Sequence, residues 1–228
     1  MKILIVADLH MDADASNAIA EASRKVDFVF CGGDIGLHRN EDPEKIADYI
    51  CNTFPPEYAL VTPGNHDFWP VNLLRLRGKE TGIRIVVDRP VCVSYKDEDF
   101  NAWFSPWSKQ FSDWNWMLND EEDWYFIPEY IDAVITHGPA YGICDECTNG
   151  DHAGSQKLLD AILDKDSIKY VFSGHIHGND YEHVTAHGKD WYNISVLDER
   201  YRFKGRLPVF DTKTGEMEYW TKNDWSEK

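Results

Sequence analysis

The chain of 228 residues contains no hydrophobic stretch long enough to cross a bilayer. The apolar run at the N-terminus is short, is interrupted by Asp8 and is followed by no small-residue cleavage site, so it does not resemble a signal peptide. No internal repeat, low-complexity tract or linker divides the sequence. These absences exclude a membrane-spanning or repeat protein. We expect one domain over residues 1–228, located in the cytoplasm.

Basic side chains are scarce, because 23 Lys and Arg residues stand against 40 Asp and Glu residues and the formal net charge is −17. A surface of this charge repels duplex nucleic acid at long range, so we expect no such partner. An anionic substrate is still compatible with this composition. Bound divalent cations would make the mouth of a site locally positive, and salt screens the more distant carboxylates.

Cysteine is also scarce, with five residues in all. The odd number favours reduced thiols in a cytoplasmic protein over a disulfide framework. Cys144 and Cys147 form a CxxC pair, but no second pair lies nearby to complete a structural zinc site. We therefore do not expect these thiols to carry the chemistry.

Five short apolar runs each end in residue types that bind metals. Short β-branched runs bounded by Gly and Pro read as buried strands. Sites in open α/β sheets form beyond the carboxyl ends of strands, so the sequence directs these side chains to one place. The runs cover 2–7, 28–31, 59–61, 132–135 and 170–172, and they lead into Asp8-Leu9-His10, Gly32-Gly33-Asp34, Gly64-Asn65-His66-Asp67, Thr136-His137-Gly138 and Gly174-His175-Ile176-His177.

The remaining pattern predicts an α/β fold with two sheets. Strands alternate with helices between residues 1 and 65, which implies a parallel sheet with right-handed crossovers. Asp42 is the expected N-cap of the second helix, with Pro43 at its first position. The tryptophans between 103 and 124 favour core packing or a hydrophobic lid over a base-stacking platform. Helices are expected near 12–24, 42–51 and 155–164, and further strands near 83–87, 91–95, 101–104, 191–196, 207–211 and 217–221.

The candidate ligands suit a centre of two metals. Two cations roughly 3.5–4 Å apart can activate a water molecule, polarise a phosphate and stabilise a leaving oxygen. One carboxylate can bridge them, and Asp34 is the candidate, because the glycines around it let the backbone approach closely. Asp8 and His10 are two residues apart, so we expect both to face one ion. His175 and His177 repeat this spacing, so one of them can serve each metal.

Mixed carboxylate and imidazole ligands suit Mn, Fe, Zn, Co or Ni better than Ca. The five motifs occur in this order in the calcineurin-like metallophosphoesterases, which the chain resembles over most of its length. The resemblance implies a four-layer α/β/β/α sandwich of two mixed sheets flanked by helices. It implies a first metal, Mn by preference, on Asp8, His10, Asp34 and His177. It implies a second metal on Asp34, Asn65, His137 and His175.

His66 has a different implied role, since the resemblance makes it a phosphate contact and the acid that protonates the leaving group. An imidazole titrates near neutral pH, which suits proton transfer. Asp67 is expected to orient the His66 ring through its other nitrogen. Arg39, Trp69 and Tyr141, together with Asn65 and His66, are the candidate substrate contacts.

The substrate class remains open at this point. Protein Ser/Thr phosphatases of the family carry Asp and Arg three and four residues after the bridging Asp, where this chain has Leu37 and His38. The likeness is greater to the small phosphodiesterase branch typified by the brain 239-type proteins, through residues 134–211. It implies hydrolysis of phosphodiesters such as cyclic nucleotides or other nucleotides. The alternatives are a phosphomonoesterase, a nuclease, or a non-catalytic metal-binding scaffold of the same fold.

Overall fold

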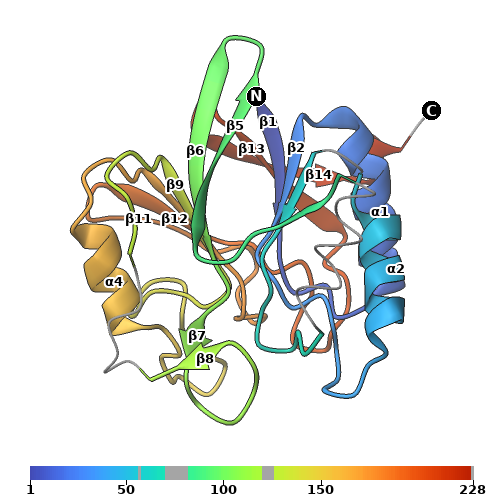
Figure 1. Ribbon diagram of the computed structural model, residues 1–228, viewed down its shortest axis with the longest axis horizontal. Helices are drawn as coiled ribbons and strands as arrows, with labels where there is room; N and C mark the ends of the chain where they lie inside the picture. The colour runs from blue at the N-terminus through green and yellow to red at the C-terminus, as the bar shows by residue number, and fades with distance from the viewer. Residues whose placement is uncertain (56–57, 70–81, 120–125, 227–228) are drawn as a thin grey trace.

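Two six-stranded sheets pack face to face and helices cover their outer faces (Figure 1). The computed structural model describes residues 1–55, 58–69, 82–119 and 126–226. Helices α1 (Ala13–Ala22) and α2 (Pro43–Thr53) cover one sheet, and α4 (Gln156–Leu163) covers the other. This arrangement confirms the predicted α/β/β/α sandwich. The expectation of one domain over residues 1–228 stays a prediction.

The first sheet is built around the N-terminal strand. Strands β1 to β4 run parallel to one another. On the other side of β1, β13 pairs with it antiparallel, and β14 pairs antiparallel with β13. In spatial order the strands are β14 (Glu216–Thr221), β13 (Arg206–Asp211), β1 (Lys2–Val6), β2 (Phe28–Cys31), β3 (Ala59–Val61) and β4 (Arg84–Ile85).

The second sheet is also mixed. Its four central strands are parallel, and the two edge strands, β11 and β5, are antiparallel to their neighbours. In spatial order the strands are β11 (His183–Ala186), β12 (Lys189–Asn193), β10 (Tyr170–Ser173), β9 (Ala133–Thr136), β6 (Glu98–Ser105) and β5 (Arg89–Tyr95). A small parallel pair, β7 (Ser108–Lys109) and β8 (Met117–Leu118), follows β6.

Capping side chains define where the helices begin. The Asp12 carboxylate accepts a hydrogen bond from the N–H of Ala15, Asp42 accepts one from Glu44, and Ser155 accepts one from Leu158. Pro43 occupies the first turn of α2, as predicted, because its missing N–H would have no partner there. A 3₁₀ turn at Ser23–Lys25 extends α1, and a short helix, α5 (Lys222–Trp225), follows β14.

Alternation along β1 explains why the sheet is buried on both faces. Leu4 and Val6 pack in the cluster under α1 and α2, whereas Ile3 and Ile5 pack in the cluster between the two sheets. Successive side chains of a strand point to opposite faces, so a strand covered on both sides needs a continuous apolar run. A third cluster, between the second sheet and α4, includes Trp103.

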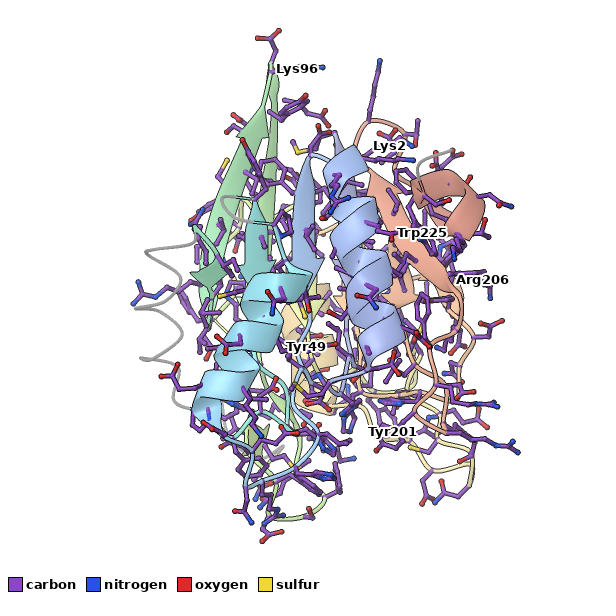
Figure 2. The ribbon with its side chains drawn as sticks, turned by 90° about the vertical axis from the view of Figure 1, so that its right-hand side faces the viewer. Lys2, Tyr49, Lys96, Tyr201, Arg206 and Trp225 are labelled. Atoms are coloured by element: carbon purple, nitrogen blue, oxygen red, sulfur yellow. The ribbon has the colours of Figure 1, made fainter. Side chains whose placement is uncertain are left out.

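The carboxyl ends of the central strands lie at the same end of the molecule. There the backbone of Ala7 joins the two sheets, since its N–H donates to the carbonyl of Ile194 and its carbonyl accepts from the N–H of Val196. Tyr201 lies at this end and Lys96, at the tip of the β5–β6 hairpin, lies at the opposite end (Figure 2). The topology therefore gathers the loops after β1, β2, β3, β9 and β10.

Most predicted elements are present within a few residues of their expected ends. The sequence did not predict β11, the β7–β8 pair or α5. All five cysteines are free thiols, and every described helix is too short or too polar to span a bilayer. Trp124, the last of the clustered tryptophans, lies outside the described residues.

Candidate metal centre

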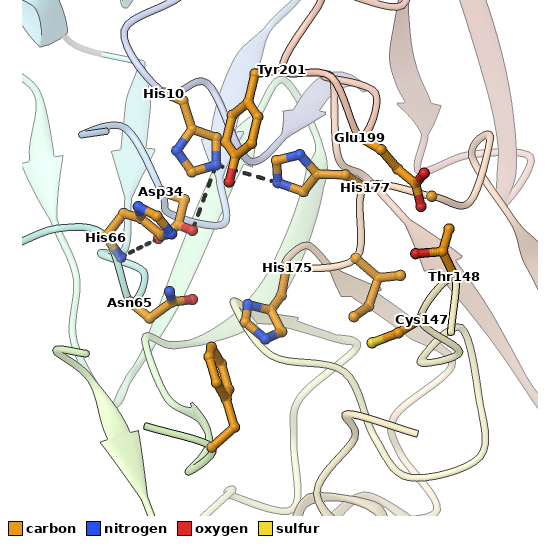
Figure 3. Close-up of a pocket in the computed structure, with 13 residues that line it drawn as sticks. His10, Asp34, Asn65, His66, Cys147, Thr148, His175, His177, Glu199 and Tyr201 are labelled. Atoms are coloured by element: carbon orange, nitrogen blue, oxygen red, sulfur yellow. Dashed lines mark hydrogen bonds and ion pairs between the residues drawn. The ribbon is translucent and has the colours of Figure 1, made fainter. Parts of the chain in front are cut away.

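A cavity of about 440 Å³ opens at the carboxyl ends of the strands (Figure 3). Asp8 and His137 are fully buried against the residues that line it. The side chains of the predicted site that line the cavity are His10, Asp34, Asn65, His66, His175 and His177. The structure therefore brings together every residue that was predicted to bind metal.

Asp34 lies between two sets of imidazoles. Its Oδ2 atom is 3.7 Å from Nε2 of His10 and 3.4 Å from Nε2 of His137. Three groups have their ligand atoms within 4.8 Å of one another, namely Asp8 with His10 and His177, Asp34 with His137 and His175, and His10 with Asp34 and His66. A carboxylate shared in this way can serve two cations at once.

Backbone carbonyls fix the orientation of the imidazoles. Nδ1 of His10 lies 3.0 Å from the carbonyl oxygen of Gly36, and Nδ1 of His137 lies 3.0 Å from that of Gly32. His177 makes a similar contact of 3.3 Å through Nδ1. A carbonyl only accepts, so Nδ1 carries a proton in each ring, and a lone pair for a metal is available at Nε2 whenever the ring is neutral. This is the arrangement of histidines that bind metals in proteins.

The donor set fits divalent transition metals. Nε2 of His10 and Nε2 of His177 are only 3.3 Å apart, so two lone pairs would face each other if both rings were neutral and no cation or proton lay between them. The buried carboxylates Asp8 and Asp34 add negative charge, and no Lys or Arg lines the cavity among the described residues. Imidazole nitrogens with carboxylate oxygens suit Mn, Fe, Zn, Co or Ni.

The backbone is strained at several of these positions. The φ angles of Asp8, His10, Asp34 and His175 are 59°, 42°, 53° and 71°, in the left-handed region that residues with a Cβ rarely adopt. Such conformations persist only where the surrounding structure imposes them, and they concentrate at functional sites.

The prediction that the strand pleat directs Asp8 and His10 to the same side is wrong, because β1 ends at Val6 and does not extend to them. The two side chains converge through left-handed turns instead.

The Asp8 carboxylate is held by groups from the second sheet. The hydroxyl of Ser195 donates to it, and the backbone N–H of His175 donates to its Oδ2 at 2.9 Å. Ser195 is fully buried and was not among the predicted site residues. Its signal in the sequence was weak, since a serine after a strand has many roles.

Charges inside the cluster shift the protonation of its members. Burial raises the pKa values of Asp8 and Asp34, but attraction to the nearby imidazoles outweighs burial and leaves both below their usual range. Burial lowers the pKa of His10 to about 4. Burial also lowers the pKa of His137, yet the carboxylate of Asp34 reverses that effect and raises it to about 9. Both carboxylates are therefore anionic at neutral pH.

His66 lines the cavity, and one of its ring nitrogens lies within 4.8 Å of the candidate ligand atoms of His10 and Asp34. Its Nδ1 is 3.0 Å from the carbonyl oxygen of Leu37, and its backbone N–H donates to Oδ1 of Asp34 at 2.7 Å. The expectation that Asp67 orients the His66 ring is wrong, because Asp67 contacts backbone groups instead. Its buried carboxylate accepts from the N–H groups of Ile35, Gly36 and Gly64, which holds the motif loops in place.

The other predicted substrate contacts divide into two groups. Tyr141, 43% exposed, lines a groove of about 930 Å³ that continues from the metal cavity past His175. Trp69 is buried in the core beneath α2 and donates its indole N–H to Asp67, so its assignment as a substrate contact is wrong. Arg39 is paired with Asp113 and is not among the residues that line the cavity, and its assignment as a substrate contact stays a prediction.

Several residues in or next to the cavity were missed by reasoning from the sequence. Trp114 stacks on His66, Tyr201 packs edge-on against His10, and Phe111 packs against His175. Glu199 also lines the cavity. The sequence shows a cluster of tryptophans, but it does not indicate which of them contacts His66. Trp114, the one that does, is 48 residues away from His66 in the chain.

A model of the calcineurin-like phosphoesterase family matches residues 1–179. The chain belongs to this family. Members of this family typically use a dinuclear metal centre, and the two groups of candidate ligands that contain Asp34 fit that expectation.

The relatives support the same assignment. Metallophosphoesterase domain-containing protein 1 from Homo sapiens is 26% identical over 219 residues, and the mouse protein matches equally. The alignment covers 80% of this chain and 65% of each relative, so the chain spans less than two thirds of their length.

Solved structures share the fold. The protein TT1561 of Thermus thermophilus superimposes with a TM-score of 0.67 at 11% identity, over 96% of this chain and 98% of that one. A protein described as a novel archaeal phosphodiesterase gives a TM-score of 0.53 at 18% identity, over 96% and 99% of the two chains. These similarities confirm the calcineurin-like phosphoesterase fold.

Proposed function

We propose that the protein hydrolyses phosphodiesters at a centre of two divalent cations, with manganese as the first choice. The position of Asp34 between two sets of imidazole nitrogens is the observation that supports this most strongly. The bound cations would activate a water molecule and withdraw charge from the phosphate. Asp8, His10, Asp34 and His177 would hold the first cation, and Asp34, Asn65, His137 and His175 the second.

His66 acts as the general acid in this proposal. Because its Nδ1–H is bound to the carbonyl of Leu37, the proton available for transfer is the one on Nε2. That proton passes to the leaving oxygen as the bond to phosphorus breaks. The backbone N–H of His66 donates to Asp34, which ties the acid to the ligand that the two clusters share.

The charge of the cavity favours diesters over monoesters. A monoester carries a second negative charge near neutral pH, which an enzyme usually balances with Arg or Lys. Among the described lining residues the cavity has no Lys or Arg, and Glu199 adds an acid at its rim. A diester carries one negative charge, which the two cations can balance without further basic groups.

The groove beyond His175 gives the second ester group a place to lie. Phe111 and Tyr141 present rings that are 60% and 43% exposed, and Phe111 lines both the groove and the metal cavity. Exposed rings of this kind bind flat apolar groups by stacking. The substrate class that these walls suit is a small phosphodiester with an aromatic or heteroaromatic substituent, such as a nucleotide.

A comparison of two nitrophenyl esters tests the proposal. The manganese-loaded protein is expected to hydrolyse bis-p-nitrophenyl phosphate with a kcat/KM at least about tenfold above that for p-nitrophenyl phosphate, since about 1.4 kcal/mol of charge mismatch suffices for tenfold. A chelator should abolish both rates. A preference for the monoester would contradict the diester assignment, and turnover that survives the chelator would contradict the metal centre.

Metal binding is expected to release protons near neutral pH. In the metal-free protein His137 is protonated at pH 7, because its pKa is raised to about 9, whereas a metal ligand must be a neutral imidazole. Apparent metal affinity therefore rises about tenfold per pH unit below this pKa and levels off above it. Calorimetric titration with Mn in buffers of different ionisation enthalpy measures the protons released. Metal binding without proton release at pH 7 would contradict the role of His137.

A further inference from the structure

The segment 113–116, between β7 and β8, lies against the turn 64–67 that carries His66. The backbone N–H of Asn115 donates to the carbonyl of Asn65 at 3.2 Å, and its side-chain amide donates to the carbonyl of Asp67 at 2.8 Å. The indole N–H of Trp116 donates to the same Asp67 carbonyl at 3.1 Å. The carbonyls on both sides of His66 are therefore held by this one segment.

The His66 ring itself is held by Trp114. The imidazole and the indole are stacked, with centroids 4.2 Å apart and planes inclined by 26°. The indole opposes tilting of the imidazole, and the contact of Nδ1 with the Leu37 carbonyl opposes rotation of the ring within its plane. Together the two contacts fix the orientation of the imidazole ring and therefore the direction in which Nε2 points.

Arg39 and Asp113 hold Trp114 in turn. The guanidinium carbon of Arg39 lies 4.6 Å from the centroid of the Trp114 ring, a cation–π distance. Two hydrogen bonds of 2.9 and 2.6 Å join Arg39 to Asp113, the residue before Trp114. This fork-like pairing fixes direction as well as distance. Residues 39 and 113–114 thus form one unit on the outer side of the cavity rim.

We propose that Trp114, supported by Arg39 and Asp113, is a positioning residue that aligns His66 for proton donation. The inference rests on the proposed role of His66 as general acid. His66 is only partly buried at an open rim, so its own packing does not fix the ring. Proton transfer needs Nε2 within hydrogen-bond reach of the leaving oxygen, and small misplacements of catalytic groups are costly.

The dependence of rate on the leaving group separates this role from a general structural one. A p-nitrophenolate leaves without a proton, whereas an unsubstituted phenolate benefits from one. In Trp114→Ala we expect kcat to fall about tenfold for the phenyl diester and less than about twofold for the p-nitrophenyl diester. The tenfold loss is a part of the 10²–10⁴-fold that general acid catalysis typically contributes to the rate. Trp114→Phe, which keeps a flat ring, should recover most of the loss.

Trp220→Ala, the loss of an indole on β14, is the matched control and should change neither rate. Equal losses for both substrates, or fewer than two metals per chain in Trp114→Ala, would overturn the proposal.

A second pair of variants tests the supporting ion pair. Arg206 is also paired with an aspartate, Asp180, through two hydrogen bonds from its Nη2, and lies over the ring of Tyr181, but it does not line the metal cavity. Arg39→Gln should lower the phenyl diester rate about threefold, a partial loss of acid alignment, and Arg206→Gln should not. Identical behaviour of the two variants would remove Arg39 from the proposal.

A measurement that needs no turnover distinguishes failure of this inference from failure of the proposed function. In the zinc-loaded protein, which is diamagnetic, the stacked indole should shift the ring proton resonances of His66 upfield in NMR spectra. Trp114→Ala should remove this shift and Trp220→Ala should keep it. If the shift is present but the wild type hydrolyses no diester, the proposed function fails and the contact stands. If the wild type is active and the shift is absent, the positioning role fails.

Discussion

Replacing Asp34 by Asn is expected to abolish hydrolysis of aryl phosphodiesters while the fold survives. Asn has nearly the same shape, so its side-chain oxygen can still accept from the His66 N–H. It lacks the negative charge and the second equivalent oxygen that two cations would share. Circular dichroism should be unchanged, metal analysis should find fewer than two ions per chain, and turnover should fall below detection.

Asp180→Asn is the control for this substitution, because Asp180 is an exposed carboxylate that pairs with Arg206 away from the cavity. Its activity and metal content should equal those of the wild type. His137→Ala should reproduce the loss of turnover, since it removes a nitrogen donor from the group of Asp34, His137 and His175 alone. Measurable turnover in Asp34→Asn would show that this carboxylate is not shared by two catalytic ions.

The second large effect is expected for His66→Ala. The rate should drop by about 10²–10⁴-fold with both metals still bound, as is typical when a general acid is lost. The reduction should be greatest for substrates with poor leaving groups. The measurement combines steady-state rates with metal analysis of the same samples, because the ligand atom of His66 lies within 4.8 Å of those of His10 and Asp34.

His183→Ala provides a matched loss of a histidine. His183 stacks on Tyr192 at an edge of the second sheet and pairs with Asp190, outside the metal cavity. Its rates should be unchanged. If His66→Ala lost its metals, His66 would be identified as a metal ligand, and its proposed role as the general acid would be contradicted.

The sequence predicted the strands and the convergence of their ends well, because both follow from local pattern. Runs such as 28–31 and 170–172 are apolar on both faces, and a motif at the end of a parallel strand has only one edge of the sheet on which to lie. The edge strand β11 illustrates the limit. Its exposed and partly exposed residues, His183 to Ala186, carry no continuous apolar signal, so the sequence did not predict it.

The interactions that orient the candidate catalytic side chains could not be predicted in the same way. Asp67 follows His66 in the chain, yet backbone geometry turns its carboxylate toward Ile35, Gly36 and Gly64. Trp69 follows the motif closely but packs into the core. These outcomes depend on tertiary contacts, which one sequence does not reveal. The candidate metal ligands, in contrast, could be proposed from the motifs alone, because imidazole and carboxylate side chains are the groups that suit divalent transition metals.

The candidate ligands of each cation come from both sheets. Asp8 and His10 follow a strand of the first sheet and His177 follows one of the second, and Asp34 meets His137 and His175 in the same manner. Any sliding of one sheet over the other would stretch both coordination shells at once. The interleaved rings of Phe30, Phe104 and Phe210 in the layer between the sheets resist such sliding. Apolar packing in the interior therefore helps to hold the two sets of candidate ligands at a fixed separation.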